Sequence, residues 1–208
     1  DIAGRYLQTD PEFKKIMVIG VYAISKFLNL KDKKTSTIFG DGAAALILGG
    51  DNGSAAAYLG SKFATDVSYF DFMGIYAGGS KHPYSEMDPG DPSLYLQVLK
   101  RYPDELNPDT WLRLILDLSR KTGIQPDDID HFFFTQINIQ SILLTLEKLG
   151  ISPERSHNIM DRYAYTGAAC LPMAFHDANV QKKIRPGDLV LFTGSGAGAS
   201  FGTAAFRM

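Results

Sequence analysis

The sequence predicts an α/β fold, and most of the evidence comes from the second half of the chain. An apolar stripe at helical spacing runs from Trp111 through Ile115 to Leu118. Short apolar runs at 131–135 and 189–193 indicate strands, and helical segments separate them along the chain. The resulting order of helix, strand, helix, helix, strand and strand is typical of packed α and β layers.

The first part of the chain is expected to contribute a helix and two buried strands. Residues 2–7 have the pattern of the later turns of an amphipathic helix, and a turn follows at 9–11. The continuous apolar run at 15–21 suits a strand that is buried on both faces, as in sheets rich in parallel strands. A second buried run is expected at 35–48, interrupted by the small residues of 39–45, which imply close backbone approach.

Residues 51–105 form the least regular part, with many glycines and prolines. They also carry a series of aromatic residues: Tyr58, Phe63, Tyr69, Phe70, Phe72, Tyr76 and Tyr84. A long aromatic loop of this kind is either the wall of a binding site or a lid or surface excursion held in place by its rings.

The remaining elements follow from capping and turn signals. The helix that contains Trp111 should end at Gly123, and Asn138 is placed to cap a helix that runs to Gly150. The last part should contain, in order, a helix at about 167–182, a turn at 186–188, a strand at 189–193, a glycine loop at 194–198 and a closing strand to residue 208.

Composition excludes several classes of protein. The 208 residues are 45% hydrophobic and 21% charged, which is a globular balance, and the net charge of −2 argues against a nucleic-acid partner. Cys170 is the single cysteine, and the histidines are scattered, so we expect a reducing, cytoplasmic setting and no metal site. We expect neither a membrane span nor a secretion signal, since no long apolar run and no signal-peptide pattern is present.

The glycine loop admits three interpretations. Gly194, Gly196 and Ala199 fit the dinucleotide-binding fingerprint superficially, but residues 200–208 have the pattern of a strand and leave no room for the required helix and ribose-binding acid. The loop could instead point a backbone N–H at a developing oxyanion, or be a tight hairpin with glycines at positive φ. Residues 39–43 resemble it as a glycine turn after a buried strand, which hints at an internal duplication.

Five blocks, taken in order, resemble the β-ketoacyl-acyl carrier protein synthase III family. They are Phe39–Ala43, Gln136–Asn138, Asp161–Tyr163 with Thr166–Ala169, Gly187–Val190 and Gly194–Gly202. The resemblance implies a thiolase-like fold, layered α-β-α-β-α, with two duplicated halves and normally a homodimer. Residues 1–55 would be the end of the N-terminal half, and 56–208 the complete C-terminal half with a variable loop region near 60–105.

The resemblance also implies the chemistry. In the family a cysteine takes an acyl group from acyl-CoA, and a His and an Asn assist decarboxylative attack by a malonyl thioester. The cysteine's position would lie about ten residues before Asp1, outside this chain. Thr135 stands at the histidine position and Tyr165 at the asparagine position. Loss of a hydrogen-bond donor to the growing negative charge typically costs about a hundred- to a thousandfold in rate, so ordinary malonyl decarboxylation is not expected to carry over unchanged.

Other site residues carry over better. The backbone N–H of Ala197 matches the family's donor to the thioester oxygen, and the Tyr165 phenol could act as a donor or, with a lowered pKa, as a base. The resemblance places Gln136, Asn138, Gly196 and Gly198 in the substrate-binding part of the site, where Gln136 and Asn138 are expected to shape and cap the turn.

Two further residues have structural interpretations. Asp41 is expected to anchor its glycine turn and not to act as an acid. Cys170 matches a small-residue position and is expected to be a small buried residue on its helix.

Two functions remain open. The first is the C-terminal part of an acyltransferase or condensing enzyme that uses acyl-CoA or acyl carrier protein thioesters, needs no further cofactor and is completed by an N-terminal segment or subunit. The second is a non-catalytic thiolase-fold scaffold or partner subunit. In either case, isolated residues 1–208 would expose faces that the other half covers, so we expect them not to form a stable monomer.

Overall fold

The computed structural model describes residues 1–49 and 57–208, so the expected boundary at 55/56 lies outside the described residues. The helices are α1 (Ile2–Thr9), α2 (Lys33–Ser36), α3 (Leu106–Thr122), α4 (Ile139–Leu149), α5 (Met160–Tyr163) and α6 (Cys170–Val180). The strands are β1 (Lys15–Tyr22), β2 (Gly42–Gly49), β3 (Ala57–Tyr69), β4 (Met73–Gly74), β5 (Gln97–Val98), β6 (His131–Phe134), β7 (Leu189–Gly196) and β8 (Gly198–Arg207). None of the helices in these two ranges has the length and apolar character needed to cross a membrane.

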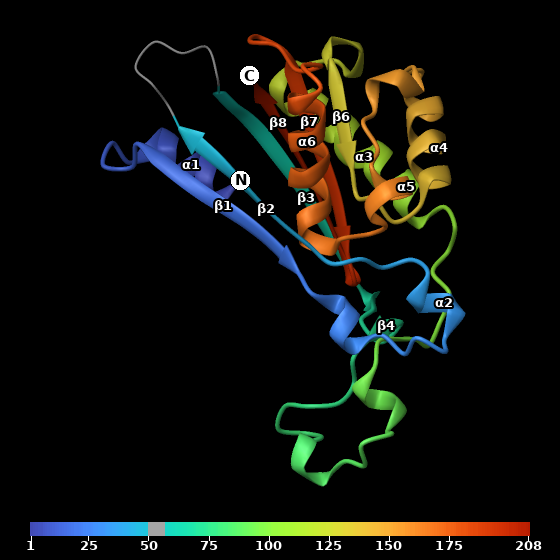
Figure 1. Cartoon of the computed structure of the whole chain (residues 1–208). Coiled ribbons are helices and arrows are strands. Elements are labelled where there is room, and N and C mark those ends of the chain that lie inside the picture. Colours follow the sequence, from blue (N-terminus) through green and yellow to red (C-terminus); the bar gives the residue numbers. More distant parts are fainter. Residues whose placement is uncertain (50–56) are drawn as a thin grey trace.

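The elements form alternating layers (Figure 1). An antiparallel pair, β1 and β2, makes the first layer. The helices α1 and α6 lie between this pair and a four-stranded sheet of order β3-β8-β7-β6, in which only β6 and β7 are parallel. The helices α3 and α4 cover the outer face of that sheet, while β4 and β5 form a small separate pair. The α/β expectation is therefore correct.

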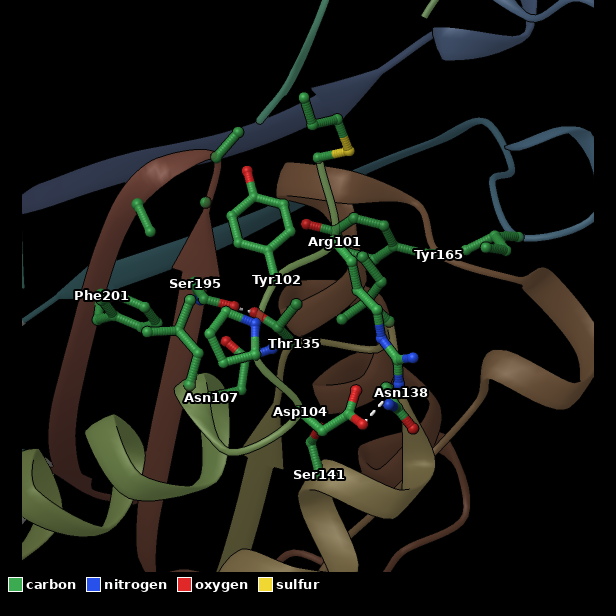
Figure 2. A pocket seen from close by; sticks show the side chains of 18 residues that line it. Arg101, Tyr102, Asp104, Asn107, Thr135, Asn138, Ser141, Tyr165, Ser195 and Phe201 are labelled. Atoms are coloured by element: carbon green, nitrogen blue, oxygen red, sulfur yellow. Dashed lines mark hydrogen bonds and ion pairs between the residues drawn. The ribbon is translucent and has the colours of Figure 1, made fainter. Parts of the chain in front are cut away.

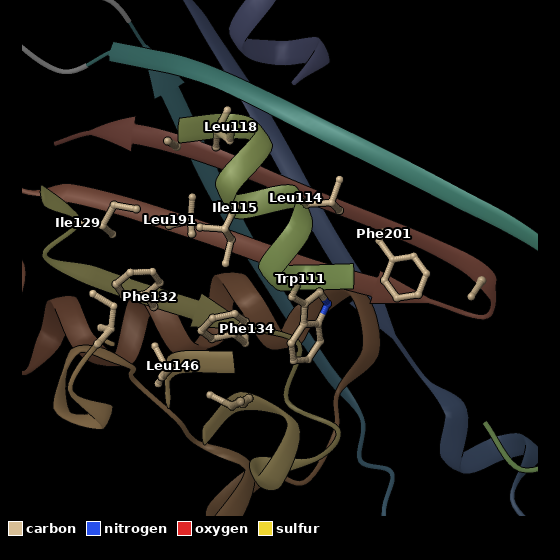
Figure 3. Close-up of a cluster of buried hydrophobic side chains, with 14 residues drawn as sticks. Trp111, Leu114, Ile115, Leu118, Ile129, Phe132, Phe134, Leu146, Leu191 and Phe201 are labelled. Carbon is tan, nitrogen blue, oxygen red and sulfur yellow. The ribbon is translucent and has the colours of Figure 1, made fainter. Parts of the chain in front are cut away.

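Alternation along β6 divides the hydrophobic core between two faces of the sheet. Phe132 and Phe134 are fully buried on one face against α3 and α4, where Trp111 packs 5.3 Å from Phe134 between ring centroids (Figure 3). Phe133 points to the other face and packs against α6 residues that include Ala174 and Phe175. Both faces of β6 are therefore covered.

Helix boundaries in this half agree with the capping signals. The amide of Gln140 donates to the Asn138 side chain over 2.9 Å at the start of α4. The helices α3 and α4 end at Gly123 and Gly150, which both adopt the left-handed conformation. These signals depend only on local backbone geometry, which is why the sequence predicts them well.

The strand at 15–21 is present, but the expectation that it is buried on both faces is wrong. Its partner β2 runs antiparallel, and only one face of the pair meets the helices α1 and α6. On the opposite face Met17, Ile19 and Ile47 are 58%, 62% and 66% exposed, with no element of the described residues packed over them. The apolar side chains on this face are therefore left uncovered by the described residues.

The expected strand before the 39–43 glycine turn is also wrong. Residues 33–36 form a helical turn because the Asp32 side chain accepts hydrogen bonds from the Lys34 amide and the Thr35 hydroxyl. The strand β2 begins only at Gly42. The 39–43 segment therefore does not repeat the strand-turn-strand form of the glycine loop at 194–198.

Pairing with β8 corrects two other expectations. Residues 57–69 of the supposedly irregular region form a long strand, whose register with β8 runs from Ala57 opposite Arg207 to Tyr69 opposite Gly198. The strand expected at 189–193 continues to Gly196, so the glycine loop shrinks to a tight hairpin around Ala197. Among the three glycines of the hairpin, only Gly198 has a positive φ, of 130°.

Gly20 allows β1 to approach the segment that precedes α6. A Cβ at Gly20 would overlap the carbonyl oxygen of Ala168. Overpacking of this kind typically costs about 1–3 kcal/mol. We predict that Gly20→Ala lowers the free energy of unfolding of the full-length protein by this amount, measured by denaturant titration. Gly49→Ala is the matched control on β2, because its Cβ would meet mainly the flexible Lys15 side chain. Equal stability of the two variants would contradict the prediction.

Candidate functional site

A cavity of about 530 Å³ opens where β6, the β7–β8 hairpin and the segment before α3 meet. Figure 2 shows its lining side chains. Most of the lining is apolar, and the polar groups that argue for a site are Arg101, Tyr102, Asp104, Asn107, Thr135, Asn138, Ser141, Tyr165 and Ser195. Gly196 and Ala197 complete the wall on the hairpin side. Thr135, Tyr165 and Ala197, far apart in the sequence, thus face one space.

Thr135 fixes the hairpin relative to the end of β6. Its side chain is 3% exposed, and its Oγ1 accepts a hydrogen bond of 2.9 Å from the Ser195 amide. Its own amide donates to the Thr193 carbonyl over 3.0 Å. Because Oγ1 acts as the acceptor toward Ser195, the hydroxyl hydrogen of Thr135 stays available for a group in the cavity.

Tyr165 is held by its backbone and by its ring. The Tyr165 amide donates to the Ile38 carbonyl over 2.9 Å, and the Gly40 amide donates to the Tyr165 carbonyl over 3.0 Å. The ring lies 5.7 Å from that of Phe39 and 6.2 Å from that of Tyr22, between centroids. This bridge joins the segment before β2 to the segment before α6, and it sets where the phenol stands.

Burial raises the pKa of the Tyr165 phenol well above its ordinary value, with smaller contributions in the same direction from Cys170 and Tyr22. A desolvated phenol keeps its proton because the charged form is disfavoured. The lowered pKa that Tyr165 would need to act as a base is therefore absent in this environment. The phenol keeps its proton and can donate a hydrogen bond.

A second cavity of about 680 Å³ lies on the α6 side of the same residues. Thr135, Tyr165, Gly196 and Ala197 line both cavities, so the hairpin and the two substituted positions stand at their junction. Residues 197–199 lie beyond the last β7–β8 pair, Gly196 opposite Ser200, and this leaves the Ala197 backbone in the turn. In this position its amide can face a bound oxygen.

The expected substrate-binding residues divide into two groups. Asn138 and Gly196 line the first cavity, and Asn138 also caps α4. Gln136 is buried, donates to the Phe134 carbonyl over 2.9 Å and accepts from the Ile159 amide over 2.8 Å. Gln136 thus shapes the turn without facing either cavity. Gly198 lines neither cavity and pairs with Tyr69.

Cys170 and Asp41 have structural surroundings. Cys170 is buried at the start of α6, and burial raises the pKa of its thiol to about 11, so little reactive thiolate forms near neutral pH. Asp41 accepts hydrogen bonds from the hydroxyl and the amide of Ser25, which lower the pKa of its carboxyl group. Asp41 therefore anchors the short turn Ile24–Phe27, and it does so as a carboxylate.

The site also contains residues that sequence reasoning missed. Arg101, Tyr102, Asp104 and Asn107 come from the end of the aromatic region and the first turn of α3. The Arg101 and Asp104 side chains, both highly exposed, form an ion pair of 2.6 Å at the edge of the cavity. Met73 and residues 101–104 belong to the irregular region at 51–105 and line the cavity, as a binding wall would. None of the seven aromatic residues on which that interpretation rested lines it.

Formal charge is scarce around this site. Arg101 and Asp104 are the charged residues of the first cavity's lining, and they neutralise each other. Over residues 1–49 and 57–208, no group of His, Cys, Asp and Glu is arranged to hold a metal ion. Thr135, Tyr165 and the Ala197 backbone offer hydrogen bonds from neutral groups.

The residue before Tyr165 has a strained backbone. Ala164 adopts φ 56° and ψ −158°, a region that glycine occupies readily and that costs other residues about 1–3 kcal/mol. Strain of this kind persists where the surrounding structure determines the conformation, and here the bridge from Tyr165 to Ile38 and Gly40 does so. The strain therefore sits directly beside a site residue.

We predict that Ala164→Gly raises the free energy of unfolding of the full-length protein by about 1 kcal/mol, because relief of strain exceeds the entropic cost of glycine. Thermal and denaturant unfolding would measure the change. Ala168→Gly, at an ordinary φ four residues later, should instead lower the stability by about 0.5–1 kcal/mol. A loss of stability in both variants would show that Ala164 is not strained.

The chain matches two sequence profiles of one family. Residues 1–67 match 3-oxoacyl-[acyl-carrier-protein (ACP)] synthase III, and residues 119–208 match the C-terminal region of the same enzyme. The β-ketoacyl-[acyl-carrier-protein] synthase III of Aliarcobacter butzleri is 30% identical over 194 residues, which cover 93% of this chain and 58% of that protein. The Syntrophomonas wolfei enzyme of the same name is 30% identical over 99% of this chain and 61% of its own length.

Solved structures agree with these matches. The 3-oxoacyl-[acyl-carrier-protein] synthase III of Aquifex aeolicus superposes with a TM-score of 0.83 and 25% identity, over 100% of this chain and 62% of that one. The enzyme of Thermus thermophilus gives a TM-score of 0.79 at 25% identity, over 100% of this chain and 63% of its own. The fold is thus the α/β thiolase-like fold, and the chain spans about three fifths of the length of these relatives. We conclude that the chain belongs to the 3-oxoacyl-[acyl-carrier-protein] synthase III family.

Proposed function

We propose that these residues form the C-terminal part of an acyltransferase that accepts acyl-CoA or acyl carrier protein thioesters, with the nucleophilic cysteine outside residues 1–208. The observation that carries the proposal is the convergence of Thr135, Tyr165 and Ala197 at the junction of two cavities. Three neutral donors around one space suit the oxygen of a thioester, on which negative charge grows during acyl transfer.

In the proposed reaction a cysteine thiolate attacks the thioester carbonyl carbon and forms a new carbon–sulfur bond. The carbonyl electron pair moves to oxygen, where the Ala197 amide and a hydroxyl donate hydrogen bonds. Collapse of this intermediate breaks the bond to the sulfur of the donor, which leaves as a thiolate and is then protonated. We expect a homodimer and no cofactor beyond the thioester substrate.

The acceptor step differs from the expected family chemistry. Thr135 and Tyr165 donate hydrogen bonds as neutral groups, and neither supplies an imidazole. We infer that the second step tolerates slower decarboxylation or uses another nucleophilic acceptor. A non-catalytic scaffold is the alternative, and it is favoured by the structural use of both residues: Thr135 holds Ser195, and Tyr165 packs between Tyr22 and Phe39.

Intact mass spectrometry of the full-length protein after incubation with a panel of acyl-CoA thioesters tests the proposal. We expect one acyl adduct, mapped by peptide analysis to a cysteine outside residues 1–208. Cys170→Ala is the matched control and should keep the adduct, because the buried Cys170 thiol has a raised pKa. Absence of any adduct would favour the scaffold, and an adduct on Cys170 would overturn the assignment of the nucleophile.

A second prediction concerns the Tyr165 donor. Tyr165→Phe keeps the ring contacts but removes the hydroxyl, so we expect acyl transfer to fall about a hundred- to a thousandfold with little change in stability. Steady-state kinetics with the preferred acyl-CoA and thermal unfolding give the two readouts. Tyr163→Phe, at an exposed neighbour, is the control. An unchanged rate in Tyr165→Phe would mean that Tyr165 serves packing alone.

A further inference from the structure

Tyr102 carries a buried hydroxyl that has no hydrogen-bond partner among the described residues. A buried donor without a hydrogen-bond partner lowers the stability of the folded state by about 1–3 kcal/mol. An unpaired hydroxyl at this position therefore calls for an explanation. The other such group in the described part of the chain, Nε1 of Trp111, belongs to the hydrophobic core and does not line the cavity. Tyr102 does line it.

The ring of Tyr102 is fixed from behind by the aromatic region. It lies 5.7 Å from Tyr69 and 5.2 Å from Phe72, between centroids, and these two rings are 4.9 Å apart. Phe72 is itself tied to this stretch, because its carbonyl accepts from the amides of Leu99 and Lys100. A side chain packed in this way has little freedom to turn its hydroxyl toward solvent, so the hydroxyl stays at the cavity.

The hydroxyl also lies near the other donors. Burial raises the pKa of the Tyr102 phenol, and the Gly198 backbone amide, which approaches the phenol oxygen as a donor at the β7–β8 turn, partly offsets this rise. The phenol hydrogen still has no acceptor among the described residues. Figure 2 shows the Tyr102 and Tyr165 hydroxyls on the same side of the cavity. Tyr102 lines only the first of the two cavities, whereas Tyr165 lines both.

These observations point to a ligand oxygen as the missing partner. A neutral carbonyl suits the position better than a carboxylate, because the charged lining residues, Arg101 and Asp104, already pair with each other. An anion buried beside neutral phenols would lose its hydration without gaining a counter-charge.

Resting on the proposed acyltransferase function, we propose that Tyr102 is a ligand-binding residue whose hydroxyl donates a hydrogen bond to the thioester carbonyl oxygen of the acyl ligand in the first cavity. Tyr102 then selects ligands that carry this oxygen. The aromatic region at the end of which it lies acts as the rigid support of that contact.

Two unreactive ligands separate this role from simple packing. One is an acyl-CoA analogue with an amide in place of the thioester, which keeps the carbonyl oxygen, and the other is an alkyl-CoA thioether of equal chain length, which lacks it. Calorimetric titration of the full-length protein gives both dissociation constants. We expect Tyr102→Phe to weaken binding of the amide analogue about three- to tenfold and to leave the thioether unchanged.

Stability supplies an independent readout. Because the hydroxyl is unpaired in the free protein, Tyr102→Phe should not lower the melting temperature. Tyr69→Phe is the matched control, since it removes a phenol from the same aromatic cluster but outside the cavity lining, and it should leave both affinities unchanged.

Equal weakening of both ligands by Tyr102→Phe, or no weakening of either, would overturn the assignment while leaving the acyltransferase proposal intact. A wild-type protein that binds neither ligand would overturn both proposals together. The wild-type titration therefore distinguishes the two failures.

Discussion

The backbone bridge between Tyr165 and the pair Ile38 and Gly40 is the constraint on which the site depends. It fastens the segment before α6 to the segment before β2, and these belong to different layers of the fold. Without it, the Tyr165 ring would have no fixed place between Tyr22 and Phe39. The second tie, from the Ser195 amide to Thr135, then sets the hairpin against the same space.

The neutrality of the site governs what chemistry it can do. Thr135 and Tyr165 present hydroxyl groups, and Ala197 presents an amide, so these three groups can stabilise growing negative charge through their dipoles. Such donors need no proton transfer of their own, and burial keeps the Tyr165 phenol protonated at ordinary pH. Stabilisation of a thioester oxyanion fits these groups. A step that needs a general base must obtain it from a residue other than Thr135 or Tyr165.

Local signals predicted much of the second half of the chain. The cap at Asn138 and the helix ends at Gly123 and Gly150 follow from backbone geometry that a few neighbouring residues decide. The long strand at 57–69 could not be found in this way, because it exists through pairing with β8 at the far end of the chain. The unpaired hydroxyl of Tyr102 could not be predicted from the sequence either, because it depends on which groups surround it in space.

The backbone strain of Ala164 and the packing of Tyr165 are physically coupled. Tyr165 stands where the resemblance places asparagine, and the alanine before it occupies a conformation that suits glycine. Strain of about 1–3 kcal/mol at Ala164 is of the same order as the gain from two aromatic pairs, each worth about 0.5–1.5 kcal/mol beyond the area they bury. The packing of Tyr165 against Tyr22 and Phe39 therefore offsets the strain of the residue before it. A glycine at 164 without the tyrosine would lose the contacts, and an asparagine at 165 with Ala164 would leave the strain uncompensated.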